Sequence, residues 1–471
     1  MANIESRTVK DVGGYQGHVD LINKRMITGW ALNTDRLDEC PIIEIWQLGK
    51  LVAAVRPSVS RPNLLTALGL STSLHRNSLF AWQIPFPLVL GISPDQPFQV
   101  KFAATGTCLS RGEDCVVPSV ESIAAEVRRD LANERFLIAE YATEGNEIDF
   151  RMRCYFEGMT HPSVLLNGKD TNFAFAAIPS ERDPLRFTDK QGYVTRLKLT
   201  EEMLHDEPLI FSVPPRDQFP HDRLRTVAIP RFIFNDKRDQ IPTPTLDHIQ
   251  RVSGPAATKL GYAIGGLTTF QQMDWLVRHH FKKSITDFDP IMDWGVGCAR
   301  VLRHFLGKTR SVLIGADIDK VNLDWCRAAI GPGATFAQLN TELATLPVDD
   351  HSIDLLYGIS VVTHLTEHHQ FQWLEELRRV MRSGGAVILT VHGEYFYYQR
   401  PRSIFLPFVE QFGFFDGIPD VALGDDLSKY YRSTFHSRHY IRENWKPYFE
   451  IVDIIPGANA FVQDFVLMRA R

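Results

Sequence analysis

Residues 291–300, IMDWGVGCAR, have the pattern of an apolar strand that runs into a glycine loop and then a helix. The strand run ends in Asp293, and Gly295 and Gly297 follow with one residue between them. Because glycine has no Cβ, a small molecule can lie directly against the backbone of such a loop. Loops of this kind bind several classes of nucleoside-containing cofactor, so the neighbouring residues must distinguish between those classes.

A dinucleotide fits these residues poorly. The pattern GxGxxG requires a small residue three positions after its second glycine, where the helix approaches the pyrophosphate. This chain has Arg300 there, and Asp293 would face the pyrophosphate with a negative charge. The full phosphate-binding motif GxxxxGK[ST] is absent. The sequence therefore argues against a dinucleotide and against a nucleoside triphosphate.

S-adenosylmethionine fits the same residues, because it carries an ammonium, a carboxylate and a sulfonium. Asp293 is placed to hold the ammonium, and Gly295 and Gly297 let the backbone lie against the sulfonium and ribose. The next strand, SVLIGAD, ends in Asp317, whose carboxylate can accept hydrogen bonds from both ribose hydroxyls. Asp319 is a weaker candidate for that role.

Three further residues near strand ends are expected to line the cofactor: Ile318, Asn340 and Ser360. Asn340 ends the third strand region, ATFAQLN, and is placed to hydrogen-bond the adenine edge. Open α/β sheets bind ligands across the carboxyl ends of their strands. We therefore expect all these residues at one edge of a sheet.

Residues 290–391 resemble the class I S-adenosylmethionine-dependent methyltransferases strand by strand. The matching pieces are MDWGVGCARVL, GADIDKVNLDWC, LPVDDHSIDLLYGISVVTHL, WLEELRRVMRSGG and VILTVHG. The ending, YFEIVDIIPG and DFVLMRAR, is similar to the antiparallel hairpin that closes that sheet. The resemblance implies S-adenosylmethionine as the cofactor and methyl transfer as the activity. The chain departs from the pattern at Ala299 and Ser383, where relatives often have glycine and proline.

Methyl transfer to a hydroxyl requires alignment of the reactants and a base near the tip of the fourth strand. His364, in GISVVTHLTEHH, is the first candidate, and its pKa class suits a base at neutral pH. His392, after the fifth strand, is the second candidate, and Glu394 could serve instead. The alternative that His364 only packs or caps a helix stays open.

A long insertion, residues 392–447, is rich in aromatic residues. Loops of this length in compact domains are usually functional, and rings with polar groups suit a sugar. We expect Tyr395, Tyr431 and His436 to contact the substrate. The alternative is a small satellite core, and both roles can apply to different residues.

The pattern before residue 240 is β-rich, with period-two alternation in PFQVKFA and EIDFRMRC and a hairpin signal at Asn167-Gly168. It predicts sandwich-like all-β modules at 1–117 and 146–240, joined by a helical connector at 118–145. From 241 to 471, strand-like and helical runs alternate, which predicts a Rossmann-like α/β domain with a mostly parallel sheet. We expect that domain to fold without the β modules.

The composition, 44% hydrophobic and 23% charged, is ordinary for a globular protein. The net charge of −5 and the lack of a long Lys/Arg run predict no nucleic-acid partner. No apolar stretch approaches the ~18 residues that span a bilayer, and the N-terminus has no signal-peptide core. The six cysteines have no CxxC spacing, which argues against a zinc site and a disulfide framework and fits a reducing cytoplasm. No carboxylate cluster demands a metal, and whether a divalent metal assists stays open.

The opening, GHVDLINKRMITGWALN, resembles β-sandwich modules fused to bacterial enzymes of surface-polysaccharide assembly. The segment YYRSTFHSRHYIRENWKPYFEIV is similar to the C-terminal part of methyltransferases of that group. This resemblance implies O-methylation of a saccharide or glycan precursor, with other glycan-assembly enzymes as partners. Two alternatives remain: a small-molecule or protein methyltransferase whose β modules bind partners, and a cofactor-binding scaffold without turnover.

Overall fold

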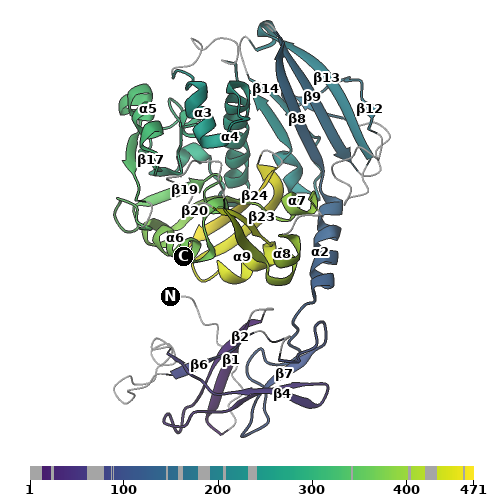
Figure 1. Cartoon of the computed structure of the whole chain (residues 1–471), viewed down its shortest axis with the longest axis vertical. Coiled ribbons are helices and arrows are strands. Elements are labelled where there is room, and N and C mark those ends of the chain that lie inside the picture. Colours follow the sequence, from purple (N-terminus) through teal and green to yellow (C-terminus); the bar gives the residue numbers. More distant parts are fainter. Residues whose placement is uncertain are drawn as a thin grey trace. The chain divides into compact units, whose positions relative to one another are not determined.

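The computed structural model describes residues 13–22, 26–60, 79–85, 87, 90–144, 147–156, 163–178, 191–204, 208–231, 241–340, 343–400, 405–419, 432–459 and 462–471 (Figure 1). The chain divides into two compact units. The first comprises Met1–Glu126 with Glu410–Phe412, and the second comprises Val127–Val409 with Gly413–Arg471. No helix of the described residues is both long and apolar enough to cross a membrane.

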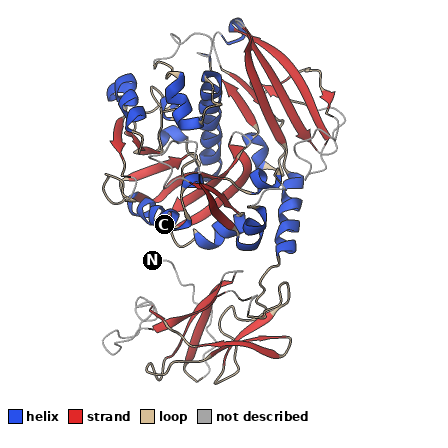
Figure 2. Cartoon of the chain, viewed as in Figure 1, coloured by secondary structure: helices blue, strands red, loops and turns tan. Residues whose placement is uncertain are grey.

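The first unit contains two antiparallel sheets around one core, shown red in Figure 2. One sheet has the order β1-β2-β6-β5, and the other has the order β4-β3-β7. Their bounds are β1 Tyr15–Ile22, β2 Met26–Asn33, β6 Leu79–Pro85, β5 Val59–Ser60, β4 Lys50–Val55, β3 Ile43–Gln47 and β7 Phe98–Phe102. Ile27 and Trp82 of the first sheet share the core with Ile45 and Val100 of the second. This is the strand-rich structure that the alternating pattern predicts.

The predicted helical connector at 118–145 is wrong in its second half. Helix α2 spans Val120–Asn133, and strand β8 spans Phe136–Glu144. β8 pairs along its whole length with β9 (Glu147–Phe156), from Phe136↔Tyr155 to Glu144↔Glu147. The segment can form a helix by local propensity, but the antiparallel pairing with β9 determines its structure.

The second unit also begins with two antiparallel sheets, of order β12-β13-β9-β8 and β11-β10-β14-β15. The remaining bounds are β10 Leu165–Leu166, β11 Lys169–Asp170, β12 Ala176–Ala177, β13 Gln191–Thr200, η3 Glu201–Leu204, β14 Leu209–Ser212, η4 Pro220–Leu224 and β15 Thr226–Ile229. Figure 1 shows β8, β9, β13 and β12 side by side. Phe150 of β9 stacks on Phe211 of β14 with ring centroids 4.9 Å apart, so the two sheets enclose one core. We call this part, from β8 to β15, the second β module.

The unit also contains a seven-stranded sheet of order β18-β17-β16-β19-β20-β24-β23 and a two-stranded sheet of β21 (Phe414–Pro419) and β22 (Arg432–His436). Neighbours from β18 to β20 are parallel, and β24 and β23 form the antiparallel closing hairpin. The bounds are β16 Ile291–Trp294, β17 Leu313–Asp317, β18 Thr335–Gln338, β19 Ile353–Gly358, β20 Met381–Val391, β23 Phe449–Asn459 and β24 Gln463–Ala470. The predicted mostly parallel α/β sheet with a C-terminal hairpin is confirmed.

Helices cover both faces of this sheet. The bounds of the helical elements are α3 Leu246–Ser253, α4 Lys259–Phe281, η7 Ile285–Asp287, η8 Leu302–His304, α5 Lys320–Ile330, η9 Gly331–Gly333, η10 Val362–His364, α6 Glu367–Val380, α7 Glu394–Tyr398, α8 Leu406–Phe412 and α9 Arg438–Asn444. Met273 of α4 packs in one core with Ile291, and Leu377 of α6 packs in the other with Met292. Because successive residues of β16 point to opposite faces, Ile291 and Met292 each face an apolar core.

Helix α4 belongs to two cores. Leu260 and Ile264 in its first half pack into the core of the second β module, whereas Met273 and Leu276 pack under the parallel sheet. Hydrogen bonds reinforce the contact, because the Gln272 side chain donates to the Leu224 carbonyl at 2.7 Å. The sequence predicted a domain boundary near residue 240, but the second β module and the α/β sheet form one compact unit.

An ionic cluster also joins these two parts. Nε2 of His221, in η4, lies 2.8 Å from Oδ2 of Asp453, in β23, and its Nδ1 lies 3.6 Å from Oε1 of Glu134. His280 of α4 contacts the same Asp453 oxygen at 3.1 Å. Burial lowers the pKa of His221, but the two carboxylates outweigh burial and raise it to about 9.

This cluster predicts a loss of stability at high pH. The pKa of His221 in the folded protein lies above its unfolded value of ~6.5, so its contribution is fully present below that value and is lost as the pH rises through about 9. The midpoint temperature of unfolding is expected to fall more between pH 7 and 10 in the wild type than in His221→Gln. Thermal scans of both proteins across this range measure the difference, and parallel curves would contradict the assignment.

Candidate active site

The glycine loop follows the central strand β16, at the carboxyl ends of the parallel strands. Gly295 and Gly297 have φ values of +81° and +51°, a conformation that side chains rarely adopt. A Cβ on Gly297 would also lie 2.8 Å from a methyl group of Val252 in α3, and one on Gly295 would overlap Val361 after β19. A side chain at either position would therefore be strained, and the loop runs close to α3 and to the segment that follows β19.

Asp317, at the end of β17, holds the glycine loop in place. Its Oδ2 accepts a hydrogen bond from the backbone N–H of Gly297 at 2.7 Å, and its Oδ1 accepts one from the N–H of Asp319 at 2.8 Å. Burial raises the pKa of Asp317, and these N–H groups act in the opposite direction. Each carboxylate oxygen has a second lone pair, so both can still accept a hydrogen bond from a ligand hydroxyl.

Asp293 is buried at the centre of the sheet edge. It pairs with Gly315 of β17 on one side and with Tyr357 of β19 on the other. Burial raises its pKa to about 7. A ligand ammonium would stabilise the charged form of this carboxyl, so the site is suited to a cationic group.

The remaining predicted cofactor residues lie at neighbouring strand ends. Ile318 directly follows β17, and Asn340 lies exposed two residues beyond β18. Ser360, after β19, has a φ of +61°, and its N–H donates to Oγ1 of Thr390 at 2.7 Å. Since β18, β17, β16 and β19 are adjacent in the sheet, the structure brings these residues to one edge, as the sequence predicts.

Asp319 has a different role from Asp317. Its side chain accepts a hydrogen bond from the N–H of Val321 and so caps helix α5. It also forms two hydrogen bonds of 3.0 Å with the guanidinium of Arg251 in α3. His248 of α3 contacts Asn322 of α5 at 2.7 Å. These contacts hold α3 beside the glycine loop.

The two candidate bases lie at the same edge. His364 is half-buried at the end of η10, after β19, and His392 is half-buried directly after β20. Nδ1 of His392 lies 3.2 Å from the Thr434 carbonyl oxygen, and its ring stacks on Phe396 with centroids 4.4 Å apart. Because a carbonyl only accepts, this contact requires a proton on Nδ1.

The structure places the expected substrate residues differently. Tyr395 is fully buried and stacks on Phe136 of the second β module at 4.9 Å. His436 is fully buried, contacts Gln370 at 2.8 Å, and has a pKa lowered by burial to about 3. Both side chains pack in the core and are closed to a substrate. Tyr431 lies outside the described residues.

Glu394 is also buried, with 1% of its surface exposed. Its carboxylate accepts the backbone N–H of Arg438 at 2.6 Å. Arg438 in turn pairs with Asp130 of α2 at 3.0 Å. Glu394 therefore belongs to a buried ionic contact between α2 and the insertion, and that position does not suit a base that must reach an acceptor.

One contact at the site has no signal in the sequence. Oγ of Ser360 lies 2.9 Å from the side-chain oxygen of Gln463, 103 residues further along the chain at the start of β24. Gln463 also contacts Asn459, whose oxygen accepts a hydrogen bond from Thr269 of α4. These side chains fix the segment after β19 to the closing hairpin, and only the fold brings them together.

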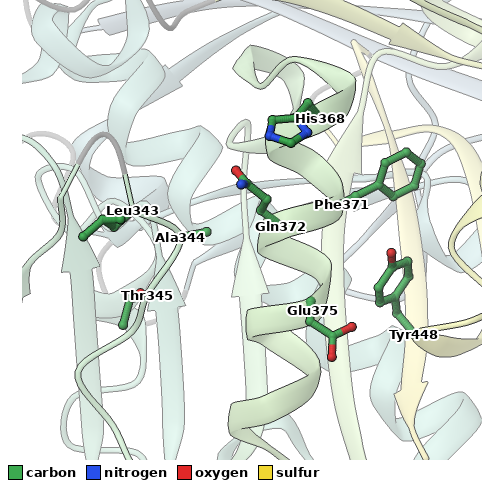
Figure 3. Close-up of a pocket in the computed structure, with 8 residues that line it drawn as sticks. All are labelled: Leu343, Ala344, Thr345, His368, Phe371, Gln372, Glu375 and Tyr448. Atoms are coloured by element: carbon green, nitrogen blue, oxygen red, sulfur yellow. The ribbon is translucent and has the colours of Figure 1, made fainter.

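A surface groove of about 560 Å³ runs along α6. Figure 3 shows its lining: His368, Phe371, Gln372 and Glu375 from α6, Leu343, Ala344 and Thr345 from the segment before β19, and Tyr448. None of the residues predicted to bind the cofactor or acceptor lines this groove. No group of three or more His, Cys, Asp or Glu in the described ranges could hold a metal ion.

Comparison with known protein families identifies the segment that carries this site. Residues 291–385 match the family model of a methyltransferase domain. The matched segment begins at β16 and ends within β20, so it includes the glycine loop, Asp317 and His364. The match supports a methyltransferase and S-adenosylmethionine as its cofactor, as the sequence predicts. No curated protein matches the chain in sequence.

Solved structures similar to the chain include an S-adenosylmethionine-dependent methyltransferase from Methanosarcina mazei. The two sequences are 17% identical, and the match covers 40% of this chain and 95% of the other chain, with a TM-score of 0.31. Magnesium protoporphyrin IX methyltransferase from Synechocystis PCC 6803 is 14% identical, with 48% and 94% covered and a TM-score of 0.33. Geranyl diphosphate C-methyltransferase from Streptomyces coelicolor A3(2) is 13% identical, with 47% and 85% covered and a TM-score of 0.30.

Asp317→Ala is expected to raise the dissociation constant for S-adenosylhomocysteine at least tenfold. The variant loses an acceptor for the ribose hydroxyls. Hydrogen bonds to a charged group contribute ~1.5–3 kcal/mol, so the binding free energy should fall by about that amount. The variant also releases the N–H of Gly297. Calorimetry measures the change, with circular dichroism to check the fold. Asp319→Ala is the matched control, because it removes a helix cap and should weaken binding less; the reverse order would transfer the ribose role to Asp319.

Proposed function

We propose that this protein is an S-adenosylmethionine-dependent methyltransferase that O-methylates a hydroxyl of a saccharide or glycan precursor. The observation that carries the methyltransferase proposal is the bond between Asp317 and the N–H of Gly297. It fixes an acid suited to ribose against the glycine loop. Asp293 lies at the same edge, where a cationic group of the donor would lie.

Bound S-adenosylmethionine would supply an activated methyl group on its sulfonium. The chain's own residues would then orient the two reactants and remove a proton. Asp293 would hold the donor's ammonium, and Asp317 would accept the ribose hydroxyls. A half-buried histidine at the neighbouring strand ends, His364 or His392, would accept the hydroxyl proton of the acceptor. Such a base typically contributes ~10²–10⁴-fold to the rate.

The saccharide acceptor rests on the resemblance of the opening segment and the C-terminal segment to polysaccharide-assembly enzymes. The similar solved methyltransferases are named for other substrates, geranyl diphosphate and magnesium protoporphyrin IX. The fold itself therefore leaves the acceptor open. A small-molecule or protein acceptor, with the β modules as partner-binding elements, is the second candidate, because these modules account for the chain before residue 240.

Transfer of a labelled methyl group tests the proposal. The full chain is incubated with methyl-labelled S-adenosylmethionine and a panel of nucleotide sugars, oligosaccharides, small phenols and bacterial proteins. We expect label in a saccharide, and none when the hydroxyls of that saccharide are acetylated or when Asp317→Ala replaces the wild type. Label only in a protein or a phenol would select the second candidate. Cofactor binding without transfer to any of them would favour the scaffold.

A further inference from the structure

Arg300, the residue that excludes a dinucleotide, lies three positions after Gly297. A Cβ on Gly266 of α4 would overlap the backbone oxygen of Arg300, so the two backbones are in close contact. Its guanidinium lies along the same helix, where a Cβ on Gly265 would be 3.1 Å from Nη1. The glycines of α4 thus let the Arg300 side chain extend along the helix toward its first turn. The side chain is half-buried.

A residue of the second β module lies next along that helix. The hydroxyl of Tyr141, in β8, is 3.7 Å from where a Cβ on Gly261 would be. Gly261 and Gly265 are one helical turn apart and therefore lie on the same face of α4. Burial raises the pKa of Tyr141, and the positive charge of Arg300 opposes that rise, which agrees with their proximity.

The side chains of Arg300 and Tyr141 have donors that no described residue of the chain accepts. Arg300 forms no ion pair and no side-chain hydrogen bond with any residue that the structure describes, and the Tyr141 hydroxyl forms none with them either. A half-buried guanidinium without a carboxylate partner is unusual, because desolvation of a charge must be offset by pairing. Asp293, within electrostatic range of Arg300, is buried in the sheet edge.

We propose that Arg300 and Tyr141 bind the carboxylate at the amino-acid end of the methyl donor, so that the second β module contributes a residue to the donor site. The inference rests on the proposed function. Asp293 and Arg300, seven residues apart, then offer a carboxylate for the ammonium of the donor and a guanidinium for its carboxylate. This pair of charges matches an α-amino acid, and Arg300 and Tyr141 both present donors to the anion.

Two ligands distinguish direct binding of the donor's carboxylate by Arg300 from mere support of the glycine loop. Both contain the adenosine and the sulfur. S-adenosylhomocysteine has the amino-acid end, and 5′-methylthioadenosine lacks it. Arg300→Gln is expected to weaken S-adenosylhomocysteine about tenfold or more and to leave 5′-methylthioadenosine unchanged. Arg300→Lys should restore part of the loss, since it keeps the charge. Tyr141→Phe should weaken S-adenosylhomocysteine alone, by a smaller factor.

Arg310→Gln is the matched control, because Arg310 is exposed ahead of the amino end of β17 and should alter neither affinity. Equal loss of both ligands in Arg300→Gln would show that the residue only supports the loop, and unchanged affinity for both would show that it does not contact the donor. Either result overturns the inference while the proposed function stands. A wild-type chain that binds neither ligand would instead contradict the proposed function.

Discussion

Alanine in place of His364 is expected to lower the turnover of methyl transfer by ~10²–10⁴-fold and to leave cofactor affinity nearly unchanged. The residue ends η10, directly beyond β19, and the glycine loop that would hold the donor follows the adjacent strand β16. Its segment is anchored, because the carbonyl of Val362 accepts hydrogen bonds from Gln370 and Thr434. Initial rates at saturating donor, with calorimetry for affinity, measure the two effects separately.

His392→Ala is the matched comparison for this prediction. Its imidazole lies at the neighbouring strand end, and its Nδ1 lies 3.2 Å from the carbonyl oxygen of Thr434. A large loss in His392→Ala beside a near-normal His364→Ala would transfer the role to His392. Near-normal rates in both variants would mean that neither histidine removes the proton and that alignment alone drives the reaction.

A chain that begins at residue 245 is expected not to fold into a stable α/β domain, which reverses the expectation from sequence. Removing the second β module exposes Leu260 and Ile264 of α4, each worth ~1.5–3 kcal/mol of burial. It also removes the partners of Gln272 and of Thr268 on the same helix. Domains of this kind have only ~5–15 kcal/mol of stability in total, so these losses consume much of it.

The matched control is a chain that begins at residue 119. It keeps α2, whose Asp130 pairs with Arg438, and Glu134 directly after that helix, which pairs with Arg225. It also keeps the whole second β module. We expect this chain to unfold cooperatively and to bind S-adenosylhomocysteine as the full chain does. Thermal unfolding and calorimetry compare the two truncations. Cooperative unfolding and full affinity in the shorter one would show that the α/β sheet is independent of the module.

Features that depend on local sequence could be predicted. Asn167-Gly168 forms a two-residue turn with positive φ, as the hairpin signal requires. The glycine loop and the end of β17 at Asp317 follow from the same kind of local pattern. The alternation of strands and helices predicted the parallel sheet, because a crossover connection needs a helix between parallel strands.

Features that depend on distant contacts could not be predicted. RVLRHFL has a helical pattern, yet it forms only the short turn η8, because Cys298 and Arg303 around it are held by Tyr262 of α4. Tyr395 and His436 have the residue types of a sugar site, but Phe136 and Gln370 bury them. In each case the deciding partner lies far away in the sequence.

One pair of titrations shows whether this chain binds a methyl donor. S-adenosylhomocysteine and NAD are titrated separately into the full chain in a calorimeter. We expect saturable binding of S-adenosylhomocysteine and none of NAD, because Arg300 occupies the place of the third dinucleotide glycine and Asp293 directly precedes the loop. Tight binding of NAD with no binding of S-adenosylhomocysteine would contradict this expectation.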